Sequence, residues 1–165
     1  MRWKTLGDKH VIDIIGFVKL AASNGQAVHI GTDSLQTGRF TQFVTVVVIL
    51  TPSKGGRVAY SREVVPRIAS LRERLLKETW RSVDLGMQLT GIVPGDLTVH
   101  IDANSVETHR SNQYVHELVG LVVGQGFNAL IKPDAWAASH AADHVVRSQG
   151  RVPPSGLVAA WPSAV

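Results

Sequence analysis

Two aspartates at the ends of short apolar segments constrain this chain more than any other feature. Asp33 closes the segment VHIGT, and Asp102 closes the segment LTVHI. A carboxylate that leaves water unpaired costs several kcal/mol or shifts its pKa until it is neutral. The pair therefore favours a bound divalent cation. Either aspartate alone could instead cap a turn or a helix, since Asp is also common in those positions.

Side-chain alternation places the two carboxylates on matching faces of their strands. Successive side chains of a strand point to opposite faces, so Asp33 shares a face with His29 and Asp102 shares one with His100. If the strands are parallel neighbours, both aspartates emerge at the carboxyl end of the sheet, where open α/β sheets bind ligands. The two histidines would either orient these carboxylates from a second shell or be satisfied within the core.

Length and composition indicate one soluble domain. With 165 residues and 44% hydrophobic content, we expect a single domain over residues 1–149 and a flexible tail over 150–165. The chain has no cysteine, which excludes thiolate metal sites and suits the cytoplasm. Asp13 and Lys19 interrupt the apolar stretch 11–22, so we interpret it as an extra amino-terminal amphipathic helix and expect no membrane span. A net charge of +4 is compatible with a nucleic-acid partner.

The order of expected elements is helix, then β-β-β-α-β-α-β-α. Turn residues and strand-like alternation make the first three strands an antiparallel meander, and the later strands should run parallel to the first. This order is typical of an α/β, RNase H-like three-layer fold, with a mixed five-stranded sheet and helices on both faces. The expected strands are 26–34, 40–51, 57–65, 97–102 and 128–132, and the expected helices are 11–22, 66–89, 111–124 and 133–148.

Several stretches of the chain resemble the YkuK-type RNase H-like proteins, a largely uncharacterised bacterial family. They are HIGTDS at 29–34, SLRERLLKET at 70–79, HID at 100–102, and IKP at 131–133 with AAS at 137–139. The resemblance implies an RNase H-like fold. It also implies the chemistry of RNase H-like nucleases, in which carboxylates hold two divalent ions about 4 Å apart. Mg²⁺ or Mn²⁺ is expected, with Asp33 bridging both ions and Asp102 completing one shell.

The long central helix should supply the third carboxylate. Glu73 and Glu78 are five residues apart, which is about 140° around a helix, so only one of them can face the site. We favour Glu78 and keep Glu73 as a candidate, because Glu73 also forms a Ser-x-x-Glu capping box with Ser70 if the helix begins there. Pro66 argues for an earlier helix start.

The fourth ligand is the least defined part of the expected site. Asp134 directly follows the last strand and is favoured over Asp143, although Asp134 could simply cap the next helix, and the position could lack a ligand. Lys132, Arg72 and Arg74 are candidates for contacts with substrate phosphates. Without metal, such a cluster repels itself, so one carboxylate should have a raised pKa, or Lys132 or His100 should approach as a substitute cation.

These features favour a Mg²⁺- or Mn²⁺-dependent nuclease or phosphodiesterase that hydrolyses nucleic acid. The alternative is a catalytically degenerate RNase H-like module that binds nucleic acid or protein, since the fourth ligand is uncertain and only 6% of residues are aromatic. The chain contains no phosphate-binding glycine loop, so we expect no nucleotide cofactor. Leu35 stands where a proofreading exonuclease has an acidic residue.

Overall fold

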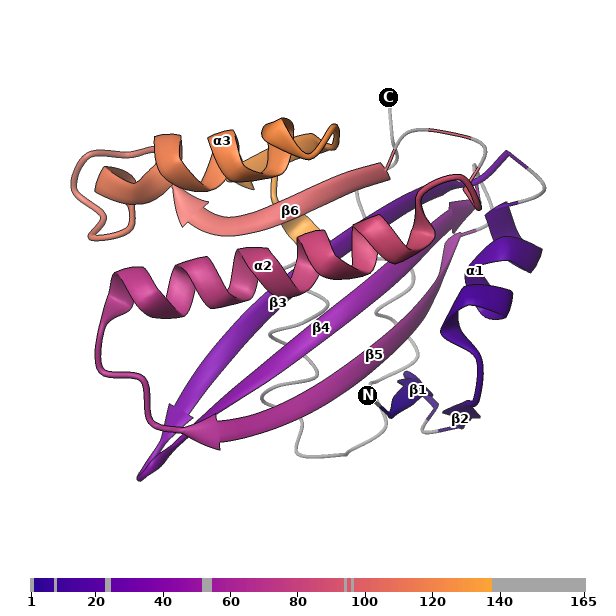
Figure 1. The fold of residues 1–165 in the computed structure, drawn as a ribbon, viewed down its shortest axis with the longest axis horizontal. Helices are drawn as coiled ribbons and strands as arrows, with labels where there is room; N and C mark the ends of the chain where they lie inside the picture. The colour runs from indigo at the N-terminus through magenta and orange to yellow at the C-terminus, as the bar shows by residue number, and fades with distance from the viewer. Residues whose placement is uncertain are drawn as a thin grey trace.

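A mixed sheet forms the centre of the computed structural model (Figure 1), which describes residues 2–7, 9–22, 25–51, 55–93, 95 and 97–137. Within these residues the sheet has seven strands in the order β2-β1-β5-β4-β3-β6-β7. The strands are β1 (Trp3–Thr5), β2 (His10–Val11), β3 (Ala27–Thr37), β4 (Phe40–Thr51), β5 (Gly55–Pro66), β6 (Leu97–Asn104) and β7 (Asn128–Lys132). The helices are α1 (Ile14–Ala22), α2 (Leu71–Leu89), the 3-10 helix η1 (Asn112–Tyr114) and α3 (Val115–Gly124).

The predicted meander and its parallel additions are confirmed. β3, β4 and β5 form long antiparallel ladders, and Gly38 turns β3 into β4 with a φ of 56°, which glycine adopts without strain. β6 pairs parallel with β3, and β7 pairs parallel with β6. The strands that carry the two aspartates are therefore central neighbours. Neither strand ends at its aspartate as predicted, because pairing with β4 extends β3 to Thr37, and β6 continues to Asn104.

The expectation of five strands is wrong, because two short strands precede α1. Trp3 pairs with Ser61 of β5 and with Val11 of β2. Strands of two and three residues are too short for a recognisable alternation, and their pairing is decided by distant partners. The first helix consequently begins at Ile14 and not at residue 11.

The central helix α2 begins at Leu71, five residues later than Pro66 suggested. The Ser70 hydroxyl accepts a hydrogen bond from the Glu73 amide, so Ser70 is the N-cap. Pro66 instead ends β5, opposite Phe40 of β4. Proline is tolerated at a strand end, where no ladder hydrogen bond requires its missing N–H.

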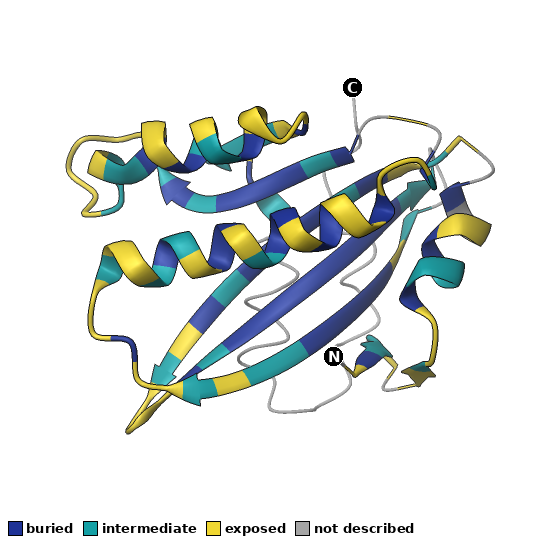
Figure 2. Cartoon of the chain, viewed as in Figure 1, coloured by how far each residue is buried: buried dark blue, intermediate teal, exposed yellow. Residues whose placement is uncertain are grey.

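Two hydrophobic clusters cover the two faces of the sheet. Side chains from α1, α2 and α3 pack with one face in the larger cluster, and Figure 2 shows α2 with buried residues toward the sheet and exposed residues outward. On the opposite face, Val44, Val46 and Val48 pack with Ala137 and Trp136. β4 is buried on both faces, which explains its nearly continuous apolar sequence.

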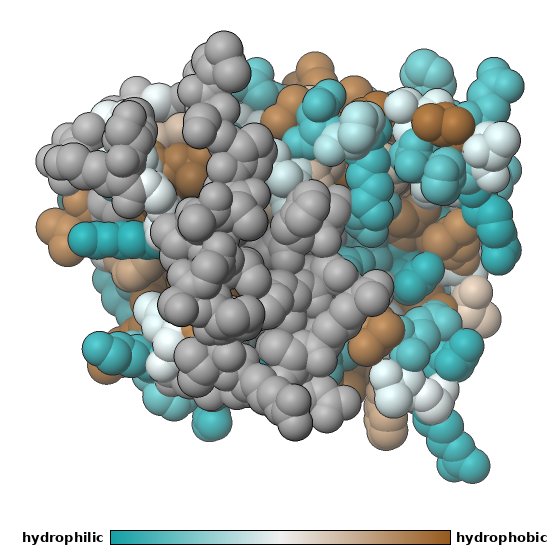
Figure 3. Space-filling model, turned by 180° about the vertical axis from the view of Figure 1, so that it is seen from behind, coloured by the Kyte–Doolittle hydropathy of each residue, from teal (hydrophilic) through white to brown (hydrophobic). Residues whose placement is uncertain are grey.

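The described helices therefore all lie on one face. The helix expected over 133–148 lies almost entirely outside the described residues, as do Asp143 and the tail 150–165. Seen from behind, the margins of the described surface combine hydrophilic and hydrophobic side chains (Figure 3). No helix in the described ranges is long and apolar enough to cross a membrane.

Candidate active site

The two central parallel strands separate just before the two aspartates. The β3–β6 ladder runs from the Val28–Leu97 pair to the Gly31–His100 pair. Asp33 and Asp102 each lie two residues beyond the last pair. Because the strands are no longer paired there, side chains from both faces of the sheet can reach the opening between them. The expectation that these strands are parallel neighbours is confirmed.

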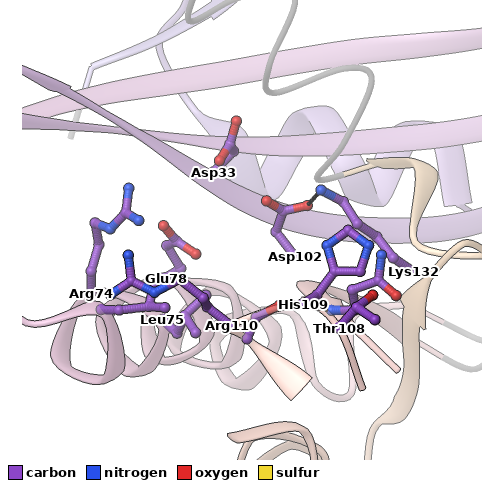
Figure 4. A pocket seen from close by; sticks show the side chains of 12 residues that line it. Asp33, Arg74, Leu75, Glu78, Asp102, Thr108, His109, Arg110 and Lys132 are labelled. Atoms are coloured by element: carbon purple, nitrogen blue, oxygen red, sulfur yellow. Dashed lines mark hydrogen bonds and ion pairs between the residues drawn. The ribbon is translucent and has the colours of Figure 1, made fainter. Parts of the chain in front are cut away.

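A pocket with a volume of about 460 Å³ lies at this opening. Figure 4 shows Asp33 from β3, Glu78 from α2 and Asp102 from β6 around it. Three carboxylates and three cationic side chains are thus among the described residues that line the pocket. The lining residues are Asp33, Leu71, Arg74, Leu75, Glu78, Asp102, Asn104, Thr108, His109, Arg110, Ser111 and Lys132.

Glu78 is the buried carboxylate of this pocket. It stands in the stripe of α2 that faces the sheet, in line with Leu75 and Ser82, and is only 5% exposed. The Ser34 hydroxyl donates a hydrogen bond of 2.5 Å to its Oε1. Burial raises the pKa of Glu78 well above its usual value, and the nearby Asp33 carboxylate raises that pKa further. Among the described carboxyl groups, Glu78 is therefore one that readily holds a proton.

An ion pair partly neutralises the second aspartate. Lys132 Nζ lies 2.6 Å from Asp102 Oδ1, and both side chains are partly exposed. The β6–β7 register shifts after the Ile101–Ile131 pair, so that Lys132 of β7 comes opposite Asn104, close to Asp102. Lys132 thus takes the place expected of a substitute cation, and Glu78 shows the expected raised pKa.

Of the other candidates on α2, one lines the pocket and two point to solvent. Arg74 lines the pocket, and its Nη1 lies 3.4 Å from the Ser34 hydroxyl, to which it donates. Glu73 does not line the pocket, because it points to solvent and pairs with Lys77 at 2.9 Å. Arg72 is also exposed and forms an ion pair with Glu117 of α3.

Asp134 does not line the pocket either. It is exposed, follows the cis peptide bond between Lys132 and Pro133, and its backbone oxygen accepts from Trp136 N. The turn after β7 leads to Trp136 and Ala137, which pack on the face of the sheet opposite the described helices. The other fourth-ligand candidate, Asp143, lies outside the described residues.

His29 and His100 form an aromatic cluster behind the pocket. His29 Nδ1 lies 3.0 Å from His100 Nε2, and the Trp136 ring lies 4.8 and 4.7 Å from the two imidazole centroids. Burial lowers the pKa of His29 to about 4 and that of His100 to about 3. These contacts favour the alternative that both are satisfied core histidines over an orienting role.

The end of β6 and the loop after it add pocket residues that the sequence did not single out. The pocket lining includes Asn104, Thr108, His109 and Arg110. The backbone N–H of Asn104 donates to the Ser111 hydroxyl at 3.1 Å. The only sequence signal for them is a run of polar residues directly after the expected strand 97–102.

The donor chemistry of the pocket fits a hard divalent ion. Carboxylate oxygens of Asp33, Asp102 and Glu78 are ligands that Mg²⁺ and Mn²⁺ accept. Over the described ranges, however, no three acidic or histidine side chains lie close enough together to hold a metal. Metal binding would therefore require these carboxylates to approach one another.

Comparison with known proteins agrees with this architecture. A family model described as ribonuclease H-like matches residues 9–147. The chain belongs to the ribonuclease H-like family. It is also 28% identical over 138 residues to the uncharacterized protein YkuK of Bacillus subtilis (strain 168), a match that covers 74% of this chain and 80% of YkuK. The predicted resemblance to YkuK-type RNase H-like proteins is thereby confirmed. No solved structure gives a significant match.

Proposed function

We propose that this protein is a divalent-metal-dependent nuclease that hydrolyses phosphodiester bonds in nucleic acid. One observation carries the proposal: carboxylates from β3, β6 and α2 line one pocket, just past the carboxyl end of the β3–β6 parallel pairing. Asp33, Asp102 and Glu78 would hold Mg²⁺ or Mn²⁺, with two ions expected. When bound, such ions activate a water molecule and stabilise the leaving oxygen.

The remaining pocket residues would bind and orient the substrate. Arg74, Arg110 and Lys132 bring positive charge to the pocket and can donate to phosphate oxygens. Lys132 now balances Asp102, so it becomes available to a phosphate when another cation neutralises that carboxylate. Ser34 holds the Glu78 carboxyl group in place through its hydrogen bond.

The test is cleavage of a panel of single-stranded, duplex and hybrid nucleic acids with Mg²⁺ or Mn²⁺. Asp33→Asn should lower the cleavage rate by about three orders of magnitude or more, because no other described group can replace a metal-binding carboxylate. Glu73→Gln and Asp134→Asn are matched controls, since both remove an exposed acid outside the pocket, and both should keep the wild-type rate. Equal cleavage by wild type and Asp33→Asn would refute the proposal.

A second candidate is a binding module that has lost catalysis. The Lys132–Asp102 ion pair and the separated carboxylates of the described residues favour it, because both are arrangements that persist without metal. Calorimetric titration with Mn²⁺ separates the two functions. Two bound ions would support the nuclease, whereas no binding together with retained affinity for nucleic acid would support the module.

A further inference from the structure

Exposed apolar side chains gather on the free end of the β3–β4–β5 meander. Leu35 is 41% exposed, Phe40 56% and Val64 58%. The strand registers align them in two rows on one face of the sheet. We call these two rows the hairpin strip: Leu35, Gln42 and Val64 in the first row, and Thr37, Phe40 and Pro66 in the second.

The hairpin strip begins next to Asp33, which lines the candidate pocket from β3. Asp33 pairs with Val44, one row before Leu35, and shares its face because the two residues are two positions apart. Thr37 is four residues beyond Asp33, which is about 13 Å along a strand. A ligand that leaves the pocket past Asp33 along β3 would therefore meet Leu35 and then Phe40.

Positive charge borders the far end of the strip. Arg39 and Arg67 are both exposed, and the Arg67 amide donates to the Arg39 carbonyl at 2.9 Å, which holds the two residues side by side next to Phe40. Glu63 of β5 lies on the other face, where it pairs with Arg81 at 2.8 Å. In Figure 3, hydrophobic and hydrophilic side chains lie together at the lower right, where this end of the meander is located.

We propose that the hairpin strip binds single-stranded nucleic acid that extends from the pocket, with bases stacked on Phe40 and phosphates near Arg39 and Arg67. The inference rests on the proposed nuclease function and adds the form of the substrate. An aromatic platform beside cations is the usual means of binding single strands without sequence preference. A duplex would not suit the strip, because its bases are already stacked inside the helix. The path from Asp33 to Thr37 would hold about four stacked nucleotides at about 3.4 Å each.

Fluorescence anisotropy in EDTA tests this binding without cleavage. The probes are labelled single-stranded oligonucleotides of about 12 nucleotides, which span pocket and strip, and of about two nucleotides, which fill only the pocket. Phe40→Ala should weaken binding of the long probe about tenfold and leave the short probe unchanged. Arg39→Gln should reduce the slope of log affinity against log salt by about 0.7 for the long probe.

Val123→Ala is the matched control, because Val123 is also 56% exposed but lies on α3. Circular dichroism should report an unchanged fold for all three variants, whose side chains are exposed. If Phe40→Ala binds the long probe as tightly as Val123→Ala, the strip proposal is overturned, while loss of cleavage in Asp33→Asn would still support the nuclease. Equal wild-type affinity for both probes also overturns it. A change of sedimentation coefficient in Phe40→Ala would also overturn the strip proposal, because it would assign the strip to contact between copies of this chain.

Discussion

Acidification below pH 6.5 should destabilise this fold through His29 and His100. His100 Nδ1 accepts from the Ala137 amide at 3.4 Å, so neutral His100 carries its hydrogen on Nε2 and donates it to His29 Nδ1. A second proton on His100 would face the Ala137 N–H. Burial lowers the pKa of His29 from 6.5 to about 4 and that of His100 from 6.5 to about 3.

The sign and size of the effect follow from these pKa values. Above pH 6.5 both histidines are neutral in the folded and unfolded chains, and their contribution to stability is fully present. As the pH falls toward 4, only the unfolded chain takes up protons, so the free energy of unfolding decreases. At about pH 5 each histidine lowers the free energy of unfolding by about 2 kcal/mol, which is a large part of a typical value of about 5–15 kcal/mol.

Glu78 affects the pH dependence of the free energy of unfolding with the opposite sign. Its pKa is raised in the folded state, so its stabilisation is complete below its unfolded pKa of 4.5 and is lost as the pH rises through the folded value. A comparison of wild type with a histidine variant at the same two pH values removes this contribution, because Glu78 is present in both proteins.

The assay is urea denaturation at about pH 7.5 and about pH 5, followed by tryptophan fluorescence. His29→Gln keeps an acceptor for His100 and removes one titrating group, so its loss of stability between the two pH values should be about 2 kcal/mol smaller than that of wild type. His116→Gln, an exposed position on α3, is the control and should follow wild type. If wild type and His29→Gln lose the same stability, the argument from burial is wrong.

Two further predictions concern helix packing and the pocket carboxyl group. A Cβ at Gly86 would lie 3.0 Å from Phe127 Cζ, so Gly86→Ala should lower the free energy of unfolding by about 1 kcal/mol. A Cβ at Gly120 would have no atom within 4 Å, so Gly120→Ala should raise the free energy of unfolding by about 0.5–1 kcal/mol. Denaturation curves of the two variants that shift in the same direction would contradict the packing argument. Ser34→Ala should raise the pKa of Glu78 further, because the lost hydrogen bond favours the carboxylate. A carbon-13 NMR titration of Glu78 measures this, and a lower pKa would refute it.

Local pattern was sufficient to predict most strands of the fold. β4 over 40–51 and β7 over 128–132 have the predicted bounds, because their β-branched runs are bounded by turn residues. The start of α2 was also present in the sequence as Ser70 followed by Glu73. Its prediction was wrong because Pro66 is equally typical of a helix start and of a strand end, and only the pairing of Pro66 with Phe40 distinguishes them.

The sequence by itself determined that Asp33 and Asp102 stand at matching positions of neighbouring parallel strands, since strand alternation and element order are local properties of the chain. The tertiary structure alone decided that Glu78 and not Glu73 lines the pocket and that Lys132 reaches Asp102. These outcomes depend on the rotation of α2 against the sheet and on the register shift between β6 and β7. Both are set by contacts between elements far apart in the chain, and a periodic pattern within one element carries no information about them.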